Sequence, residues 1–244
     1  MEVYVELTGD ESTLKTLSET FKNKKEDFAI TKKDNSYVLT SEKFKHMNDL
    51  EIRKKANEII KKLNKSVKLS LEPRKPIIAK SIIKDEGKRK NVTFFANTLR
   101  IVMKPYSPTV LTDKEGNVLR RYPHDFIKEV YNLTEKNKNL SDALEIYDPN
   151  SLDPREYYKI FEIIRKDVGG EKNFSKIIGF SINEIDRFKR SCQHPEAVGL
   201  KKSRHAVPEC KPPKKPMSPE EMKRFIKISL EKWILKINEE LEKR

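Results

Sequence analysis

Apolar and polar residues alternate at several places in the first hundred residues of the chain. Val3, Val5 and Leu7 fall on one face of a half-buried strand, which Gly9 and Asp10 end. Similar patterns predict strands at residues 3–7, 28–31, 37–40, 67–71, 77–83, 91–95 and 99–103. Two stretches instead carry apolar residues three or four positions apart, which predicts one helix after Asp10 and another at about 48–64.

These elements follow one another in the order β-α-β-β-α-β, with added hairpin strands. That order is typical of a ferredoxin-like sheet with two helices on one side. We therefore expect an α+β protein in which residues 1–104 form a ferredoxin-like domain. Residues that interrupt long elements follow it (Pro105, Pro108, Gly116 and Pro123), so residues 105–139 are expected to form an irregular connector.

Residues 140–244 have the pattern of a small helical domain. Apolar residues at helical spacing predict helices at about 140–147, from 154, from 182 and at 219–241. Three of these helices begin at residues that favour helix starts: Asp153 before Pro154, Ser181 with Glu184, and Ser218 with Glu221.

The charge balance points to an anionic partner. The chain of 244 residues has 52 Lys and Arg against 38 Asp and Glu, a net charge of +14. Such an excess favours nucleic acid or another polyanion, although a lysine-rich source also produces basic proteins that touch no nucleic acid. No apolar run approaches the ~18 residues of a membrane span, and two cysteines make no disulfide framework. We therefore expect a cytoplasmic protein without membrane contact.

The most informative stretch is the basic loop, residues 193–217, which lies between two predicted helices and is interrupted by prolines. Arginine binds phosphate through two parallel hydrogen bonds, and loops between rigid elements often carry binding sites. The basic loop and the helix before it therefore suggest an anion or nucleic-acid site formed by Arg187, Arg190, Lys202, Arg204 and His205.

A metal site is an alternative for the same region. Four soft or borderline ligands occur there, namely Cys192, His194, His205 and Cys210. Their spacing is not a familiar zinc spacing, and Cys192 lies on the apolar face of its helix. The favoured interpretation therefore includes no metal and no cofactor.

Catalysis and simple fastening are further alternatives. His205 would serve as the general base of a hydrolase or nuclease, with Arg204 or Arg187 stabilising negative charge. However, the sequence contains no paired-carboxylate, phosphate-loop or nucleophile-elbow spacing. Arg204 would otherwise bridge Asp186 or Glu162 and fasten the loop, and the prolines also suit a protein-interaction module.

The C-terminal segments resemble a group of bacterial proteins to which no activity is attached. The similarity is carried by YYKIFEIIRKDVGG, RFKRSCQHPEAVGLKKSRHA and PPKKPMSPEEMKRFI. The resemblance implies a βαββαβ-like first half and a helical second half, without a substrate or cofactor. Its pattern includes Arg187, Phe188, Arg204, His205, Pro213, Pro216 and Met217, but not Cys192, His194 or Cys210.

Overall fold

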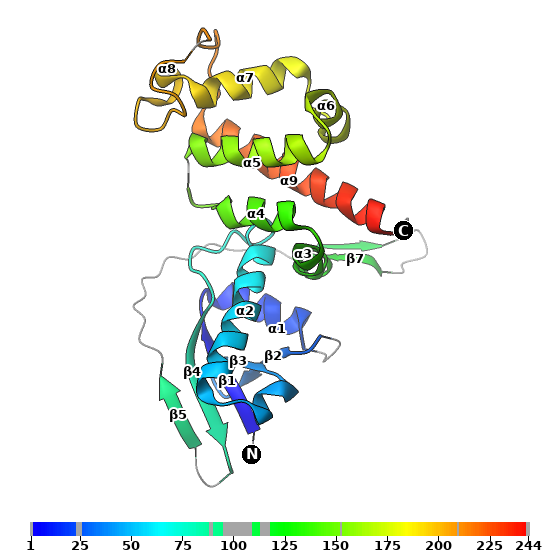
Figure 1. Cartoon of the computed structure of the whole chain (residues 1–244). Coiled ribbons are helices and arrows are strands. Elements are labelled where there is room, and N and C mark those ends of the chain that lie inside the picture. Colours follow the sequence, from blue (N-terminus) through cyan, green and yellow to red (C-terminus); the bar gives the residue numbers. More distant parts are fainter. Residues whose placement is uncertain are drawn as a thin grey trace. The chain divides into compact units, whose positions relative to one another are not determined.

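The computed structural model describes residues 2–22, 26–87, 90–94, 109–112, 118–151, 153–208 and 210–242. The chain is a mixed α+β protein, as the sequence predicts, and it divides into two compact units (Figure 1). Unit 1 comprises residues 1–131 and unit 2 comprises residues 132–244. In the described part of the chain, no helix is long and apolar enough to cross a membrane.

Unit 1 is built on a five-stranded sheet in which all neighbouring strands are antiparallel. The strand order is β2-β3-β1-β4-β5. On the central strand, Val5 lies opposite Leu39 on one side and opposite Ile82 on the other. The strands are β1 (Glu2–Thr8), β2 (Ala29–Lys33), β3 (Ser36–Thr40), β4 (Ile78–Asp85) and β5 (Lys90–Phe94).

Two helices pack on one face of this sheet. They are α1 (Glu11–Thr20) and α2 (Asp49–Val67), with a short 3-10 helix, η1 (Glu42–His46), before α2. Apolar residues of both helices share one buried cluster with alternate residues of β1. A capping box fixes the start of α2, because the side chain of Asn48 accepts from the backbone of Glu51 and that of Glu51 accepts from the backbone of Asn48.

The strand expected at 67–71 is wrong. Helix α2 continues to Val67, and the backbone N–H of Leu71 donates to the carbonyl of Val67 in a turn that follows. Val67 extends the apolar stripe of α2, one turn after Leu63, so its burial follows from the helical period. The strand expected at 99–103 lies outside the described residues.

The stretch expected to be an irregular connector contains regular structure where it is described. Strands β6 (Thr109–Thr112) and β7 (Val118–Tyr122) pair, and helix α3 (His124–Lys136) follows the cis bond between Tyr122 and Pro123. Within unit 1, the Tyr131 ring on α3 lies 5.5 Å from the Phe21 ring. The division between the two units therefore falls inside α3.

Unit 2 is helical in its described part, and phenylalanine rings form much of its core. The Phe161 ring lies 5.0 Å from that of Phe174 and 5.6 Å from that of Phe188. Buried Trp233 donates from Nε1 to Asp167 at 2.8 Å. The helices are α4 (Lys138–Ile146), α5 (Pro154–Asp167), α6 (Glu171–Ile178), α7 (Ile182–Gln193), α8 (Pro195–Val198) and α9 (Pro219–Glu242).

Candidate nucleic-acid interface

The basic loop folds back on the end of α7. The backbone N–H of Arg204 donates to the carbonyl of Cys192 at 3.0 Å, and that of His205 donates to the carbonyl of Gln193 at 3.4 Å. The Ser203 hydroxyl donates to the carbonyls of Leu200 and His205. The stretch that includes α8 is therefore a compact turn attached to the C-terminal end of α7.

Arg204 attaches this turn to α5. Its Nη2 lies 3.3 Å from Oε1 of Glu162, and its guanidinium lies 4.2 Å from the centre of the Tyr158 ring. Both contacts come from one face of α5, because residues four apart in a helix lie above one another. The sequence offered Glu162 as a partner if Arg204 only fastens the loop, and the structure contains this ion pair. Arg204 therefore has a structural partner.

Arg187 holds the other end of the basic loop. Its Nε donates to the carbonyl of Lys215 at 2.7 Å, and its Nη2 lies 3.2 Å from both the carbonyl of Pro216 and the Glu221 carboxylate. The backbone N–H of Ser218, and then Arg187, hold the pKa of Glu221 below its ordinary value. One guanidinium thus connects α7, the loop and the first turn of α9.

Arg190 also has an acidic partner but, among the described residues, its side chain makes no second contact such as those of Arg187 and Arg204. Its Nε lies 2.8 Å from Oδ2 of Asp186, one turn earlier on α7, and both side chains are 41% exposed. Exposed pairs of this kind contribute little to stability. The structure therefore leaves Arg190 easier to redirect toward a ligand than Arg187 or Arg204.

The unpaired positive charge of the basic loop resides in its lysines. Five lysines of the loop are exposed, namely Lys201, Lys202, Lys211, Lys214 and Lys215. Within the described part of the chain, none of them has a carboxylate at ion-pair distance. Lys202 is near Asp153, whose pKa is lowered first by the Arg155 side chain and further by the charge of Lys202. The residues proposed from the sequence therefore differ in role: Lys202 is free to bind, while Arg187 and Arg204 are engaged in the fold.

His205 lies in the same turn as Lys202 and Arg204, and it is exposed. Among the described residues, His205 makes hydrogen bonds only through its backbone: its N–H donates to the carbonyl of Gln193, and its carbonyl accepts from the Ser203 hydroxyl. A catalytic histidine needs a second group that orients its ring. The described surroundings of His205 supply none.

The four residues of the metal alternative do not converge. The Cys192 thiol is buried beside the Met222 sulfur at 3.7 Å, and burial raises its pKa. The His194 Nδ1 accepts from the backbone of Glu196 at the start of α8. Among the described residues, no group of three or more His, Cys, Asp or Glu side chains is placed to hold a metal ion.

A short turn at the start of α7 was missed by the sequence interpretation, because α6 was not predicted. Gly179 ends α6 in the left-handed conformation, at φ 83°, and Ser181 begins α7 with the capping box that the sequence predicts. The turn between the two helices has only three residues, 179–181. The spacing of Phe174, Ile178 and Gly179 is the signal that was present in the sequence.

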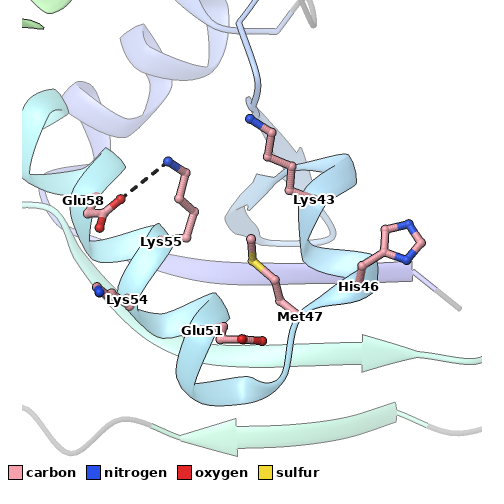
Figure 2. Close-up of a pocket in the computed structure, with 7 residues that line it drawn as sticks. All are labelled: Lys43, His46, Met47, Glu51, Lys54, Lys55 and Glu58. Atoms are coloured by element: carbon pink, nitrogen blue, oxygen red, sulfur yellow. Dashed lines mark hydrogen bonds and ion pairs between the residues drawn. The ribbon is translucent and has the colours of Figure 1, made fainter.

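A hollow lined by described residues of unit 1 has a volume of about 580 Å³ and lies between η1 and α2 (Figure 2). Figure 2 shows the Met47 side chain within it and the His46 ring pointing away. Lys55 pairs with Glu58 at 3.5 Å on its rim. Because the rim mixes both signs of charge, this hollow does not select one class of ligand.

Comparison with known proteins found no matching family model, no matching curated sequence and no matching solved structure.

Proposed function

We propose that this protein binds nucleic acid through the lysines of the basic loop. The observation that supports the proposal is the exposed set at positions 201, 202, 211, 214 and 215, which has no ion-pair partner in the described structure. Over residues 193–217 the sequence has six Lys and Arg against two Glu. Because Arg204, the one arginine in this range, is engaged within the fold, most of this excess is available to phosphate groups.

Lysine ammonium groups suit contacts with a phosphate backbone. They act as flexible, hydrated point charges, whereas arginine recognises planar groups through a fixed fork. Backbone contacts of this kind determine affinity and its salt dependence, but not sequence preference. We therefore expect the loop to contribute sequence-independent affinity.

The salt dependence of binding tests this proposal. If about five lysines each neutralise one phosphate, the slope of log K against log salt is about −4.5, or a loss of roughly 500-fold between 50 and 200 mM salt. Fluorescence anisotropy with a labelled DNA duplex measures it. Lys214→Ala with Lys215→Ala should reduce the slope by about 2.

A charge-matched control separates the loop from the overall charge of the protein. Lys15→Ala with Lys54→Ala removes two exposed lysines of unit 1 and should leave the slope unchanged. Absence of binding at 50 mM salt contradicts the proposal. Equal slopes for the two double variants also contradict it, since they would assign binding to net charge alone.

The proposal extends to fold and location. We infer a ferredoxin-like arrangement for unit 1, supported by its β1-α1-β2-β3-α2-β4 succession, with β5 as an added hairpin strand. We infer that unit 2 is a helical domain that carries the binding loop, and that the protein acts in the cytoplasm. The free thiols Cys192 and Cys210 support a reducing environment.

A further inference from the structure

We propose that α6, the turn at 179–181 and α7 form a helix-turn-helix unit that places the outer face of α7 in the major groove of double-stranded DNA. This inference rests on the proposed nucleic-acid binding and adds a class of ligand to it. It also adds sequence preference, which the lysines of the basic loop cannot provide.

The first support is the geometry of the turn. DNA-binding helix-turn-helix units join two steeply inclined helices by three or four residues that often include glycine. Here three residues join α6 to α7, and Gly179 adopts φ 83°. Figure 1 shows α6 nearly end-on beside α7, which is seen from the side, so the two helices are steeply inclined.

The second support is the packing that fixes the two helices to each other. Phe174 and Ile178 of α6 are buried, as are Ile185 and Phe188 of α7. The Phe161 ring of α5 packs against the rings of Phe174 and Phe188. The inner faces of α6 and α7 are therefore used for the core of unit 2, and α7 is held as a rigid element.

The turn itself is also fastened. The Ser175 hydroxyl donates to the carbonyl of Phe180 at 2.7 Å, and Lys232 Nζ donates to the carbonyl of Ile178 at 2.7 Å. The short side chain of Ser175 permits this close approach. The start of α7 thus has a fixed direction relative to α6.

The third support is the chemistry of the outer face of α7. Ser181, Ile182 and Asn183 are exposed at its start, and Ile182 is 47% exposed. In helix-turn-helix proteins the first residues of the second helix contact base edges. Asparagine pairs with adenine N6 and N7, and an apolar side chain meets the methyl group of thymine. The exposed pair of Arg190 and Asp186 leaves Arg190 able to turn to a guanine or a phosphate.

Glu184, the acidic residue in the first turn of α7, is compatible with this role. The Glu184 carboxylate accepts from the backbone and hydroxyl of Ser181, so part of its charge is already satisfied. The positive charge comes from the adjoining loop, because Arg187 binds the carbonyl of Lys215 and keeps this part of the loop beside α7. The lysines therefore serve as phosphate contacts next to a helix that reads bases, a common division between positioning and specificity.

The test begins with selection of preferred duplexes from a random pool by the full chain. Affinities are then compared for the selected duplex, a scrambled duplex and the selected single strand, all at 50 mM salt. We expect a preference for the selected duplex over both others. Asn183→Ala should reduce this preference about tenfold without changing affinity for the scrambled duplex, and Ile182→Ala should reduce it at any thymine it contacts.

Matched variants distinguish the possible failures. Asn57→Ala makes the same change at an exposed site of unit 1 and should alter nothing, while Lys214→Ala with Lys215→Ala should weaken all DNA equally. Salt-dependent binding without an enriched duplex sequence overturns this inference and leaves the proposed function in place. Sequence preference that survives both Asn183→Ala and Ile182→Ala overturns the role of α7. Absence of any binding overturns both proposals.

Discussion

Arg187 provides the sharpest test of the division between fastening arginines and binding lysines. Arg187→Ala removes two hydrogen bonds to the carbonyls of Lys215 and Pro216 and an ion pair with Glu221. Partly exposed hydrogen bonds from a charged donor contribute about 0.5–1 kcal/mol each, and an exposed ion pair about 0.5 kcal/mol. We therefore expect unit 2 to lose about 1.5–2.5 kcal/mol of its free energy of unfolding.

Trp233 supplies the assay. It is the single tryptophan in the sequence and is buried in unit 2, so its fluorescence during urea unfolding reports on this unit alone. With a urea slope of about 1.5 kcal/mol per molar, the urea midpoint should fall by roughly 1 to 1.7 M. Lys214→Ala is the control, because this exposed side chain lacks an ion-pair partner in the described structure; its midpoint should not move.

One further variant tests the geometry of these contacts. Arg187→Lys keeps the charge but not the fork that reaches two carbonyls and a carboxylate, so it should recover less than half of the loss. An Arg187→Ala midpoint equal to that of Lys214→Ala, combined with lost DNA binding, would refute the reasoning and make Arg187 a ligand-binding residue.

The same contact has a pH signature. The Ser218 backbone N–H, followed by Arg187, lowers the pKa of folded Glu221 below its ordinary value of 4.5. A carboxyl group whose pKa is lowered in the folded state stabilises the protein at pH values above its unfolded-state pKa. This stabilisation is lost as the pH falls through its folded-state pKa. In Arg187→Ala the folded pKa moves back toward 4.5, so the dependence of stability on pH below 4.5 should be smaller than in the wild type.

Three other changes have defined outcomes. Gly179→Ala adds a Cβ to a residue at φ 83°, 3.1 Å from the Lys232 ammonium, and should destabilise unit 2 by about 1–2 kcal/mol. Gly199 has a similar φ of 81°, but a Cβ added there meets no atom within 4 Å. Gly199→Ala should therefore show a smaller loss of stability in the same fluorescence assay. Burial raises the pKa of the Cys192 thiol. In the native protein this thiol should therefore react with a disulfide reagent at least about tenfold more slowly than the partly exposed Cys210 thiol, and unfolding in urea should remove the difference. Burial, and then a hydrogen bond to a neighbouring carboxylate, raise the pKa of Tyr37 to about 12, so stability should fall as the pH rises from about 10 toward 12, and Tyr37→Phe should flatten that fall.

Local signals in the sequence predicted much of the regular structure. The capping box of Ser181 and Glu184 and the cap of Asp153 before Pro154 are confirmed, because each depends on residues only a few positions apart. Helix α6 was missed for the opposite reason. It has eight residues, and Gly170 before it offers no side-chain cap. Its burial depends on distant partners such as Phe161, which no local pattern reveals.

The candidate site shows the same limit of local information. The sequence identified where cations gather, but the partners of the arginines lie far away along the chain. Arg204 meets Glu162 and Tyr158, and Arg187 meets the carbonyl of Lys215. Only the folded structure separates these engaged cations from the free lysines. The outer residues of α7, such as Asn183, become candidates only once the turn after α6 is known.

The division between the two cations follows from their chemistry. A guanidinium can hydrogen-bond carbonyls, pair with a carboxylate and lie against an aromatic ring, and Arg187 and Arg204 together make all of these contacts. An ammonium is more strongly hydrated and gains less from a fixed partner, so lysine is the better cation for a surface that must stay open. Fastening also keeps the loop ordered before binding, which lowers the entropy cost of positioning its lysines along a phosphate backbone. Arg187 and Arg204 therefore support binding without contacting the ligand, and their loss should weaken binding by disordering the loop.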